Sequence, residues 1–301
     1  MSFRIVEISK PAEIHIKNRQ LEIMQEEGTV YVPIEDIVHI IVSGPNIRLS
    51  TMDLLVLNQN KIVVTILDKK FLPSSFVLPF EGNVRQSKFM HKQTEFSKDG
   101  YRRLWIQIVC KKITNQARAL MMLGMGEAEK VGKYARKIDL GNVDYHESLA
   151  AKEYFALFHN GLKRRSDAPI NSRLNYGYAV VRGAIAREIV CVGLHPAFGL
   201  HHNNQLNYFN LADDLIEPFR PIVDMLACGL DSTNELLSRE ERRALACVLY
   251  NACMINDRKM SVLEAIGEVC ESLKRIIGED SAEDLHLPDI LPTELLDRIT
   301  E

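Results

Sequence analysis

The chain has 301 residues, of which 46% are hydrophobic and 26% charged, a composition typical of a globular protein with a sizeable core. Its formal net charge of −3 excludes a uniformly basic nucleic-acid coat, although a local positive stripe is enough for nucleic-acid binding. No apolar run reaches the ~18 residues that cross a bilayer, and the start of the chain lacks the apolar region of a signal peptide. We therefore expect a cytoplasmic protein that does not interact with a membrane.

Several common enzyme motifs are absent. The six cysteines form no Cys-x-x-Cys pair and no zinc-ribbon spacing, so we expect reduced thiols. The segment GMGEAEKVGK at 124–133 resembles a phosphate loop, but it has one residue too many between Gly126 and Gly132, and Tyr134 replaces the required Ser or Thr. There is no Gly-x-Ser-x-Gly and no His-Glu-x-x-His. ATP hydrolysis, serine hydrolysis and zinc proteolysis therefore lose their usual sequence support.

The first ~75 residues contain short runs of Val, Ile, Thr and Tyr, which predict β-strands. The runs include FRIVEI at 3–8, TVYVPI at 29–34, DIVHIIVSG at 36–44 and KIVVTILD at 61–68. One helix is predicted to interrupt them over residues 49–60, with Ser50 or Thr51 placed to cap its start.

From about residue 88 the apolar residues recur at three and four positions, as at Leu104, Ile108 and Ile113, which predicts that the rest of the chain is mainly helical. The change follows FVLPFEGNVRQSK at 76–88, where a proline and a glycine favour a break. We predict a β-rich domain over residues 1–85 and a larger α-helical domain over residues 86–301. Strands followed by helices indicate an α+β fold without the βαβ alternation of a doubly wound sheet.

Histidines, amides and carboxylates crowd into residues 193–221, GLHPAFGLHHNNQLNYFNLADDLIEPFRP, which indicates a solvated loop or a site. Asp214 and Glu217 are three residues apart, so they share one helix face if Asn210 caps that helix. Together with His202 they form a donor set that a hard divalent metal accepts. The alternative is that the two acids only stabilise a first helical turn through the helix dipole.

A further acid, Glu147, lies in YHESLAAKEYFALF at 145–158, at the predicted opening of an Ala-rich helix. Taken alone, it is interpreted as an ordinary first-turn acid. His195 and His201 are interpreted as turn or core-edge histidines in preference to metal ligands.

Four separated motifs change the weight of these interpretations. They are HESLAAKEYF at 146–155, INSRLNYGYAVVRGAIARE at 170–188, GLHPAFGLHH at 193–202 and NLADDLIEPFRP at 210–221. In this order and spacing they closely resemble the CRISPR-associated adaptation integrases, the universal spacer-acquisition endonucleases, and especially their type II-like branch. The resemblance extends from the β-rich region to about residue 225.

The resemblance implies that Glu147, His202 and Glu217 are the catalytic metal ligands and that Asp214 supports them from the same helix. Glu147 matches the glutamate that opens a family helix, His202 ends the Gly-Leu-x-Pro-x-x-Gly-x-x-His motif, and Glu217 precedes Pro-Phe-Arg. Two positions depart from the family pattern. Ser148 replaces a common Gly, and Glu217 stands where many relatives have Asp, so its longer side chain must place its oxygen differently.

The implied reaction is the attack of a 3′-hydroxyl of captured DNA on a phosphodiester at a CRISPR repeat, with Mg²⁺ or Mn²⁺ as cofactor. The implied partners are DNA, a second copy of this chain bound through the β-rich domain, and a small ferredoxin-like adaptation protein. The type II effector nuclease is a further candidate partner. Two other functions stay open: a metal-dependent nuclease of branched or single-stranded DNA, and a catalytically silent DNA-binding scaffold.

Local basic charge suggests how DNA is held, because phosphate contacts give sequence-independent affinity. The alternative for each basic residue is a solvated helix face. Tyr176 is expected to stack on an unpaired base, with core packing as its alternative. The predicted DNA-binding residues are Lys163, Arg164, Arg165, Arg173, Tyr176 and Arg182.

Overall fold

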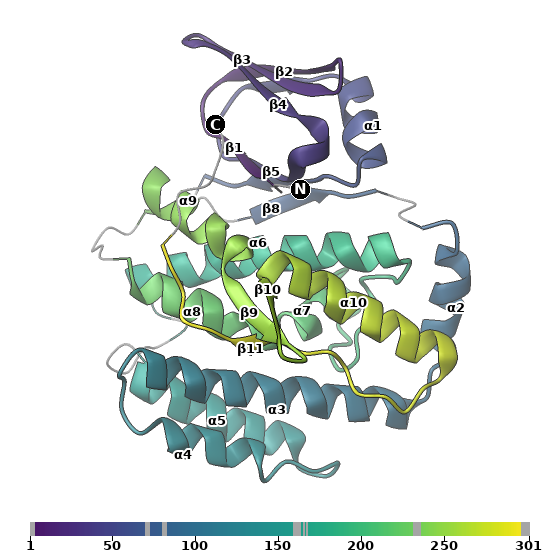
Figure 1. Ribbon diagram of the computed structural model, residues 1–301, viewed down its shortest axis with the longest axis vertical. Helices are drawn as coiled ribbons and strands as arrows, with labels where there is room; N and C mark the ends of the chain where they lie inside the picture. Colours follow the sequence, from purple (N-terminus) through teal and green to yellow (C-terminus); the bar gives the residue numbers. More distant parts are fainter. Residues whose placement is uncertain are drawn as a thin grey trace.

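The amino-terminal region is built from strands, as the computed structural model in Figure 1 shows. The structure describes residues 4–69, 73–79, 83–158, 164, 166, 168–230 and 236–295. The strands and the helical segments between them are β1 (Arg4–Ile8), β2 (Ala12–Lys17), β3 (Gln20–Gln25), β4 (Gly28–Pro33), η1 (Ile34–Asp36), β5 (Ile37–Val42), β6 (Ile47–Leu49), α1 (Thr51–Gln59), β7 (Val63–Leu67) and β8 (Pro73–Val77). The predicted helix at 49–60 is confirmed, and Ser50 caps it through a capping box with Asp53.

The strands form two four-stranded sheets. One has the order β1-β5-β7-β8, with β8 antiparallel to three parallel strands, and the other has the order β4-β3-β2-β6. The strand β5 reads as a continuous apolar run because both of its faces are covered, with Ile40 in the cluster between the sheets and Ile41 in the cluster against the helices. The parallel strands β5 and β7 are connected through α1, so one local crossover occurs where none was expected.

Helices dominate after residue 85. They and their intervening segments are α2 (Gln86–Glu95), α3 (Lys98–Met122), α4 (Ala128–Ala135), α5 (Val143–Leu157), α6 (Pro169–Val192), α7 (Asn210–Leu215), η3 (Glu217–Phe219), α8 (Arg220–Cys228), α9 (Arg239–Ala246), η4 (Cys247–Tyr250), β9 (Ala252–Ile255), β10 (Arg258–Ser261), α10 (Val262–Glu279) and β11 (Asp289–Ile290). The α+β class is therefore confirmed. Among the described residues, no helix is long and apolar enough to span a membrane.

A small sheet of β10, β9 and β11 was not expected in the helical region. Its strands are at most four residues long, too short for a clear period-two pattern. The turn between β9 and β10 is formed by Asn256 and Asp257, both with positive φ, as a tight hairpin requires. The prediction that this region is mainly helical holds for most of its length but not here.

The helical layers lie below the sheets in Figure 1, with α6 against the sheet and α3 between α6 and the pair α4–α5. The apolar positions predicted on α3 are confirmed, since Leu104, Ile108 and Ile113 are buried. The β-rich region is also tied to the helices by an ion pair of 2.9 Å between Glu7 and Arg242. The division into domains at residue 85 stays a prediction. The six cysteines are free.

Candidate functional site

The segment between α6 and α7 begins where Gly193 ends α6 with φ of 96°, in the left-handed region that glycine favours. The segment then turns tightly at Gly199, where a Cβ would lie 2.3 Å from the carbonyl oxygen of His202 and 2.8 Å from Asp214 Oδ2. A side chain there would therefore clash with the backbone of the segment itself. Both glycines of the Gly-Leu-x-Pro-x-x-Gly motif thus shape the path of the chain toward His202.

The buried carboxylate of Asp214 organises this segment. It accepts backbone N–H bonds from Leu200, His201 and His202 at 2.6, 3.0 and 3.2 Å, and a ring contact from His202 Nδ1 at 2.6 Å. Since a carboxylate only accepts, Nδ1 of His202 carries the proton and Nε2 faces away from Asp214 with its lone pair in the neutral ring. The hydrogen bond to Asp214 raises the pKa of His202, against a smaller opposing effect of burial.

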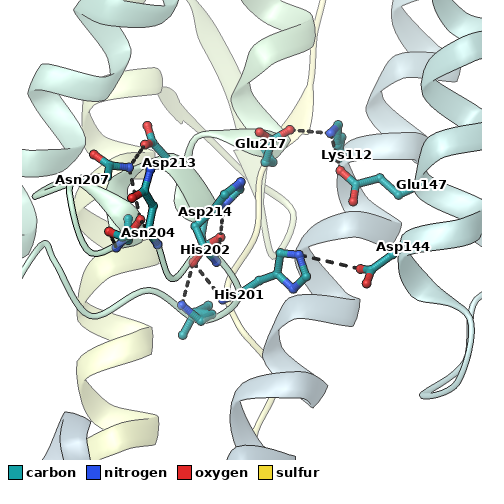
Figure 2. A network of polar contacts seen from close by, with 12 residues as sticks. Lys112, Asp144, Glu147, His201, His202, Asn204, Asn207, Asp213, Asp214 and Glu217 are labelled. Carbon is teal, nitrogen blue, oxygen red and sulfur yellow. Dashed lines mark hydrogen bonds and ion pairs between the residues drawn. The ribbon is translucent and has the colours of Figure 1, made fainter.

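Glu147 on α5 and Glu217 on η3 meet at one cation, the ammonium group of Lys112 on α3. The Lys112 Nζ atom lies 2.6 Å from an oxygen of each carboxylate (Figure 2). The pyrrolidine of Pro218 follows Glu217 in a 3-10 turn, and Arg220 closes the other side of Glu217 with a contact of 2.8 Å. Three separate parts of the chain, α3, α5 and the adjoining η3 and α8, therefore bring two acidic and two basic side chains together.

The charges of this cluster stabilise one another. Burial opposes ionisation of Glu217, but Arg220 and Lys112 outweigh burial and lower the pKa of Glu217 to about 2. Burial alone would lower the pKa of Lys112, yet Glu217 and Glu147 raise it above its usual value. Glu217 is therefore anionic and Lys112 is cationic at neutral pH.

The donor set fits a divalent cation in its chemistry. Lys112 marks a point at which both carboxylates stabilise a positive charge, and its contact with Glu217 Oε2 lacks hydrogen-bond geometry, so that oxygen keeps acceptor capacity. His202 is oriented by Asp214, the carboxylate–histidine arrangement common behind metal ligands. In the described parts of the chain, however, no three His, Cys, Asp or Glu side chains are close enough to hold an ion together. These residues would hold an ion only if Lys112 withdrew and His202 approached the two carboxylates.

Three sequence predictions about this region are wrong in detail. Asn210 is the first residue of α7 rather than its cap, and its amide donates to the carbonyls of Ala197 and Asn204. Asp214 and Glu217 do not share one face, because α7 ends at Leu215 and the chain continues as a 3-10 turn. Glu147 lies in the second turn of α5, which begins four residues earlier.

The structure contradicts two of the predicted DNA contacts. Arg173 is 1% exposed and forms an ion pair with Glu241 at 2.5 Å, so it holds α6 against α9. Tyr176 is fully buried in the helical core and has no face for a base. The prediction failed because most of α6 is buried on all sides, so a basic or aromatic residue there does not indicate a surface.

The other predicted DNA contacts differ in their surroundings. Arg182 is partly exposed, pairs with Asp213 and lies 4.8 Å from the ring of Phe209. Arg164 donates to Asn171 and Asn175 and lies over Tyr178. Lys163 and Arg165 fall outside the described residues.

Sequence reasoning missed the residues that complete the cluster. Lys112 lies in the basic run CKKITNQAR at 110–118, and nothing in the sequence of that run distinguishes it from Lys111. A signal existed for Arg220, because it is three residues after Glu217, a spacing at which opposite charges pair.

Comparison with known proteins identifies a family model and curated relatives that are similar to this chain. The family model described as CRISPR associated protein Cas1 matches residues 6–257. A CRISPR-associated endonuclease Cas1 from Neisseria meningitidis is 33% identical over 297 residues, which cover 97% of this chain and 98% of the relative. A second, from Pyrobaculum aerophilum, is 25% identical over 86% of this chain and 94% of the relative.

Solved structures share the fold at lower identity. A casposase bound to integration product has a TM-score of 0.79 at 18% identity, and the alignment covers 99% of this chain and 96% of the casposase chain. A Cas1 protein from Thermotoga maritima has a TM-score of 0.73 at 19% identity, with 94% and 99% covered. The resemblance seen in the four motifs is confirmed, and the chain belongs to the CRISPR-associated Cas1 family, whose curated members named above are endonucleases.

Proposed function

We propose that this protein is a metal-dependent DNA endonuclease and integrase that inserts captured DNA fragments into a CRISPR array. In this reaction the 3′-hydroxyl of the fragment attacks a phosphodiester at the repeat, the new bond forms to that oxygen, and the 3′-oxygen of the cleaved strand leaves. The observation that carries the proposal is the convergence of Glu147 and Glu217 on one cation beside a loop that presents His202.

The proposed roles follow from the contacts. Glu147, Glu217 and His202 would hold a Mg²⁺ or Mn²⁺ ion, while Asp214 fixes the ring of His202 through Nδ1. When bound, the ion polarises the phosphate and lowers the pKa of the attacking hydroxyl. Arg220 keeps Glu217 ionised and in place. The ammonium group of Lys112, which lies 2.6 Å from an oxygen of each carboxylate, would neutralise phosphate charge beside them.

DNA is the proposed substrate, held by Arg182 and by the basic segment at 163–165, which contains Arg164. The structural neighbours support this reading, since one is a casposase bound to integration product and another is a Cas6-RT-Cas1–Cas2 complex with a TM-score of 0.75 at 16% identity. The alignment with that complex covers 97% of this chain and 36% of the matched chain of the complex. A small ferredoxin-like adaptation protein is accordingly a proposed partner, and the type II effector nuclease is a further one.

A homodimer formed through the β-rich region is also proposed, with residues 1–85 as dimerisation domain and 86–301 as catalytic domain. Within the described residues β4 is an edge strand of its sheet, paired only with β3, and its Tyr31 side chain is 55% exposed. Unpaired strand edges favour association with another chain. Measurement of the molar mass of the purified protein in solution tests this homodimer. We expect the variant Tyr31→Lys to be monomeric.

The function is tested by strand transfer of a labelled duplex with 3′-hydroxyl ends into a repeat-bearing plasmid, with the adaptation partner and Mg²⁺ or Mn²⁺. We expect joined product from the wild type, and none from Glu217→Gln, from a chelated reaction or from a donor with blocked 3′ ends. Cutting that ignores the 3′ end would replace the integrase by a nuclease. Tight DNA binding with no metal-dependent product would leave a scaffold.

A further inference from the structure

The side-chain amide of Asn115 joins three segments that are far apart in the chain. Asn115 lies on α3 and is fully buried. Its Nδ2 atom donates to the carbonyl oxygens of Pro218 and Pro288, each at 2.9 Å, and its Oδ1 atom accepts from the backbone N–H of Ile290 at 3.5 Å. Both hydrogens of the amide are therefore used, and α3 is tied at one point to η3 and to the end of the chain near β11.

The contact with Pro218 holds the backbone that carries Glu217. Pro218 directly follows Glu217 in η3, so its carbonyl belongs to the turn from which the Glu217 side chain leaves. Pro218 and Pro221 lack an N–H group, and the carbonyl of Glu217 therefore cannot receive the helical hydrogen bond from the residue four positions later. A donor on α3 thus supports a turn that has lost part of its own backbone hydrogen bonding.

The helix α3 holds Glu217 at two points. Lys112 is three residues before Asn115, which places both on the same side of the helix. The ammonium group of Lys112 contacts the Glu217 carboxylate at 2.6 Å, while the Asn115 amide holds the backbone one residue further on. The first contact joins two charges and is lost if Lys112 withdraws. The second is neutral, so it keeps the backbone of Glu217 in place when the cation beside its carboxylate changes.

The amide of Asn115 is itself held by the segment after α10. This strap, residues 281–290, runs along α3 and ends in β11 (Figure 1). The α3 residues that bind it are four apart and form one stripe along the helix. Gln107 forms two hydrogen bonds with the strap, both of 2.8 Å, and Lys111 forms one of 2.6 Å. Asn115 is the next residue of the stripe, at the point where the strap and η3 meet.

We infer that Asn115 is a positioning residue for the proposed reaction, which fixes the backbone of Glu217 from α3 and is itself fixed by the strap. The inference rests on the proposed function, because the position of Glu217 matters to the reaction only if its carboxylate is a ligand. A carboxylate that is in place before an ion binds loses less conformational freedom on binding, and the affinity is higher for that reason. Asn115 acts through Glu217 and is not itself a ligand.

The test compares Asn115→Leu with Gln107→Leu. Both variants remove an amide of α3 that binds the strap, but only Asn115 also binds η3. NMR is recorded on metal-free protein that is isotope-labelled at the side-chain carboxyl carbon of glutamate, and the resonance missing from Glu217→Gln is that of Glu217. We expect Asn115→Leu to shift or broaden this resonance and Gln107→Leu to leave it in place. Equal changes in the two variants, or no change in Asn115→Leu, would overturn the inference.

A second measurement is the affinity for Mn²⁺, by titration calorimetry on the folded variants. We expect Asn115→Leu to weaken binding about 10-fold and Gln107→Leu to change it less than about twofold. A residue that only ties the strap to α3 would lower the melting temperature in both variants and leave the affinity unchanged in both. That result would reduce Asn115 to a structural residue.

Asn115→Leu leaves buried carbonyls without a donor, so it costs stability. Asn115→Ser is the milder variant, because its hydroxyl still donates to one carbonyl and the space left by the amide admits water. We expect it to change the resonance and the affinity in the same direction by a smaller amount. It replaces Asn115→Leu in both measurements where that variant does not fold.

Strand transfer by the wild type is measured separately, so the two proposals can fail independently. If the wild type binds no Mn²⁺ and joins no DNA, the metal-dependent integrase is wrong, while the resonance still shows whether Asn115 places Glu217. If the wild type joins DNA and Asn115→Leu leaves both the resonance and the affinity unchanged, the integrase stands and the positioning role is wrong.

Discussion

Glu217 and Asp224 are two buried carboxylates, seven residues apart, with opposite chemistry. Glu217 has Lys112 and Arg220 as direct partners, and they lower its pKa to about 2 in spite of burial. Asp224 instead accepts from the hydroxyls of Tyr154 and Tyr178, and burial outweighs these hydrogen bonds and raises its pKa to about 6. Equal burial therefore does not give equal charge: a cation in direct contact keeps a carboxylate ionised, whereas neutral donors do not.

The difference in pKa corresponds to a difference in role between Glu217, which belongs to the candidate site, and Asp224, which supports that site from the core. Glu217 stays anionic, as its proposed role as a metal ligand requires. Asp224 holds two tyrosines, and Tyr178 in turn lies 4.6 Å beneath the guanidinium of Arg220. The buried Asp224 cluster thus positions Arg220, which positions Glu217.

The strongest way to break this comparison is to remove the cation from Glu217. In Lys112→Met two adjacent carboxylates lose their shared partner, and we expect the metal-free protein to lose about 3 to 5 kcal/mol of unfolding free energy. Mn²⁺ should then stabilise this variant more than it stabilises the wild type, because the ion replaces the lost charge. Urea unfolding with and without Mn²⁺ measures both effects.

The neighbouring Lys111 supplies the control. It pairs with Asp289 at 2.6 Å but is more exposed than Lys112, so Lys111→Met should cost less than about 1 kcal/mol and should not change the response to Mn²⁺. If the two variants lost equal stability, the shared cation would have no special role.

The contribution of Asp224 to the comparison is tested by the pH dependence of the unfolding free energy. Between pH ~4 and ~6 the native state holds a proton on Asp224 that the unfolded chain has released, so this residue favours folding below pH ~4 and loses that effect as pH rises through its native pKa. Relative to Asp224→Asn, wild-type unfolding free energy should fall by about 3 kcal/mol across this range and stay level above pH ~7. Urea unfolding at a series of pH values measures it, and parallel curves for the two proteins would contradict it.

Asp214 tests the other half of the site. Asp214→Asn removes the acceptor that fixes the ring of His202, and we expect Mn²⁺ affinity to fall about 10- to 100-fold. Titration calorimetry on the folded protein measures this. Asp213→Asn changes the neighbouring acid, which contacts Arg182 rather than the histidine, and should leave the affinity within about twofold. A variant that lost stability but kept the affinity would reduce Asp214 to a structural residue.

The smallest expected effect concerns Arg182. If it contacts a phosphate, Arg182→Gln should reduce the slope of log affinity against log salt by about 0.9. If it serves only Asp213 and Phe209, the slope will not change, while stability falls by less than about 1 kcal/mol. Fluorescence anisotropy at several salt concentrations distinguishes the two results.

The sequence predicted what depends on local chemistry. The α1 cap at Ser50, the buried positions of α3 and the change from strands to helices all follow from neighbouring residues. The β9–β11 sheet did not, because β11 reaches β9 from more than thirty residues away in the chain and its two residues carry no pattern of their own.

Part of the candidate site was likewise predictable, and part was not. Glu147, His202 and Glu217 came from the spacing of family motifs, and their assignment as ligands stays a prediction. Lys112 could not be singled out, since its role depends on α3 passing between α5 and η3, a packing relation that no local pattern carries. The prediction for Arg173 was wrong because its role also depends on packing between distant segments: its partner Glu241 lies 68 residues away.

The contacts of Asp214 also bear on the entropy of metal binding. An exposed loop histidine ordinarily loses rotamer and backbone freedom when it coordinates an ion, and that loss weakens binding. Here one buried carboxylate restrains three consecutive backbone amides and the ring of His202 as soon as the chain folds. The ordering of His202 is thus part of folding, and the proposed metal ion would bind a side chain that is already restrained.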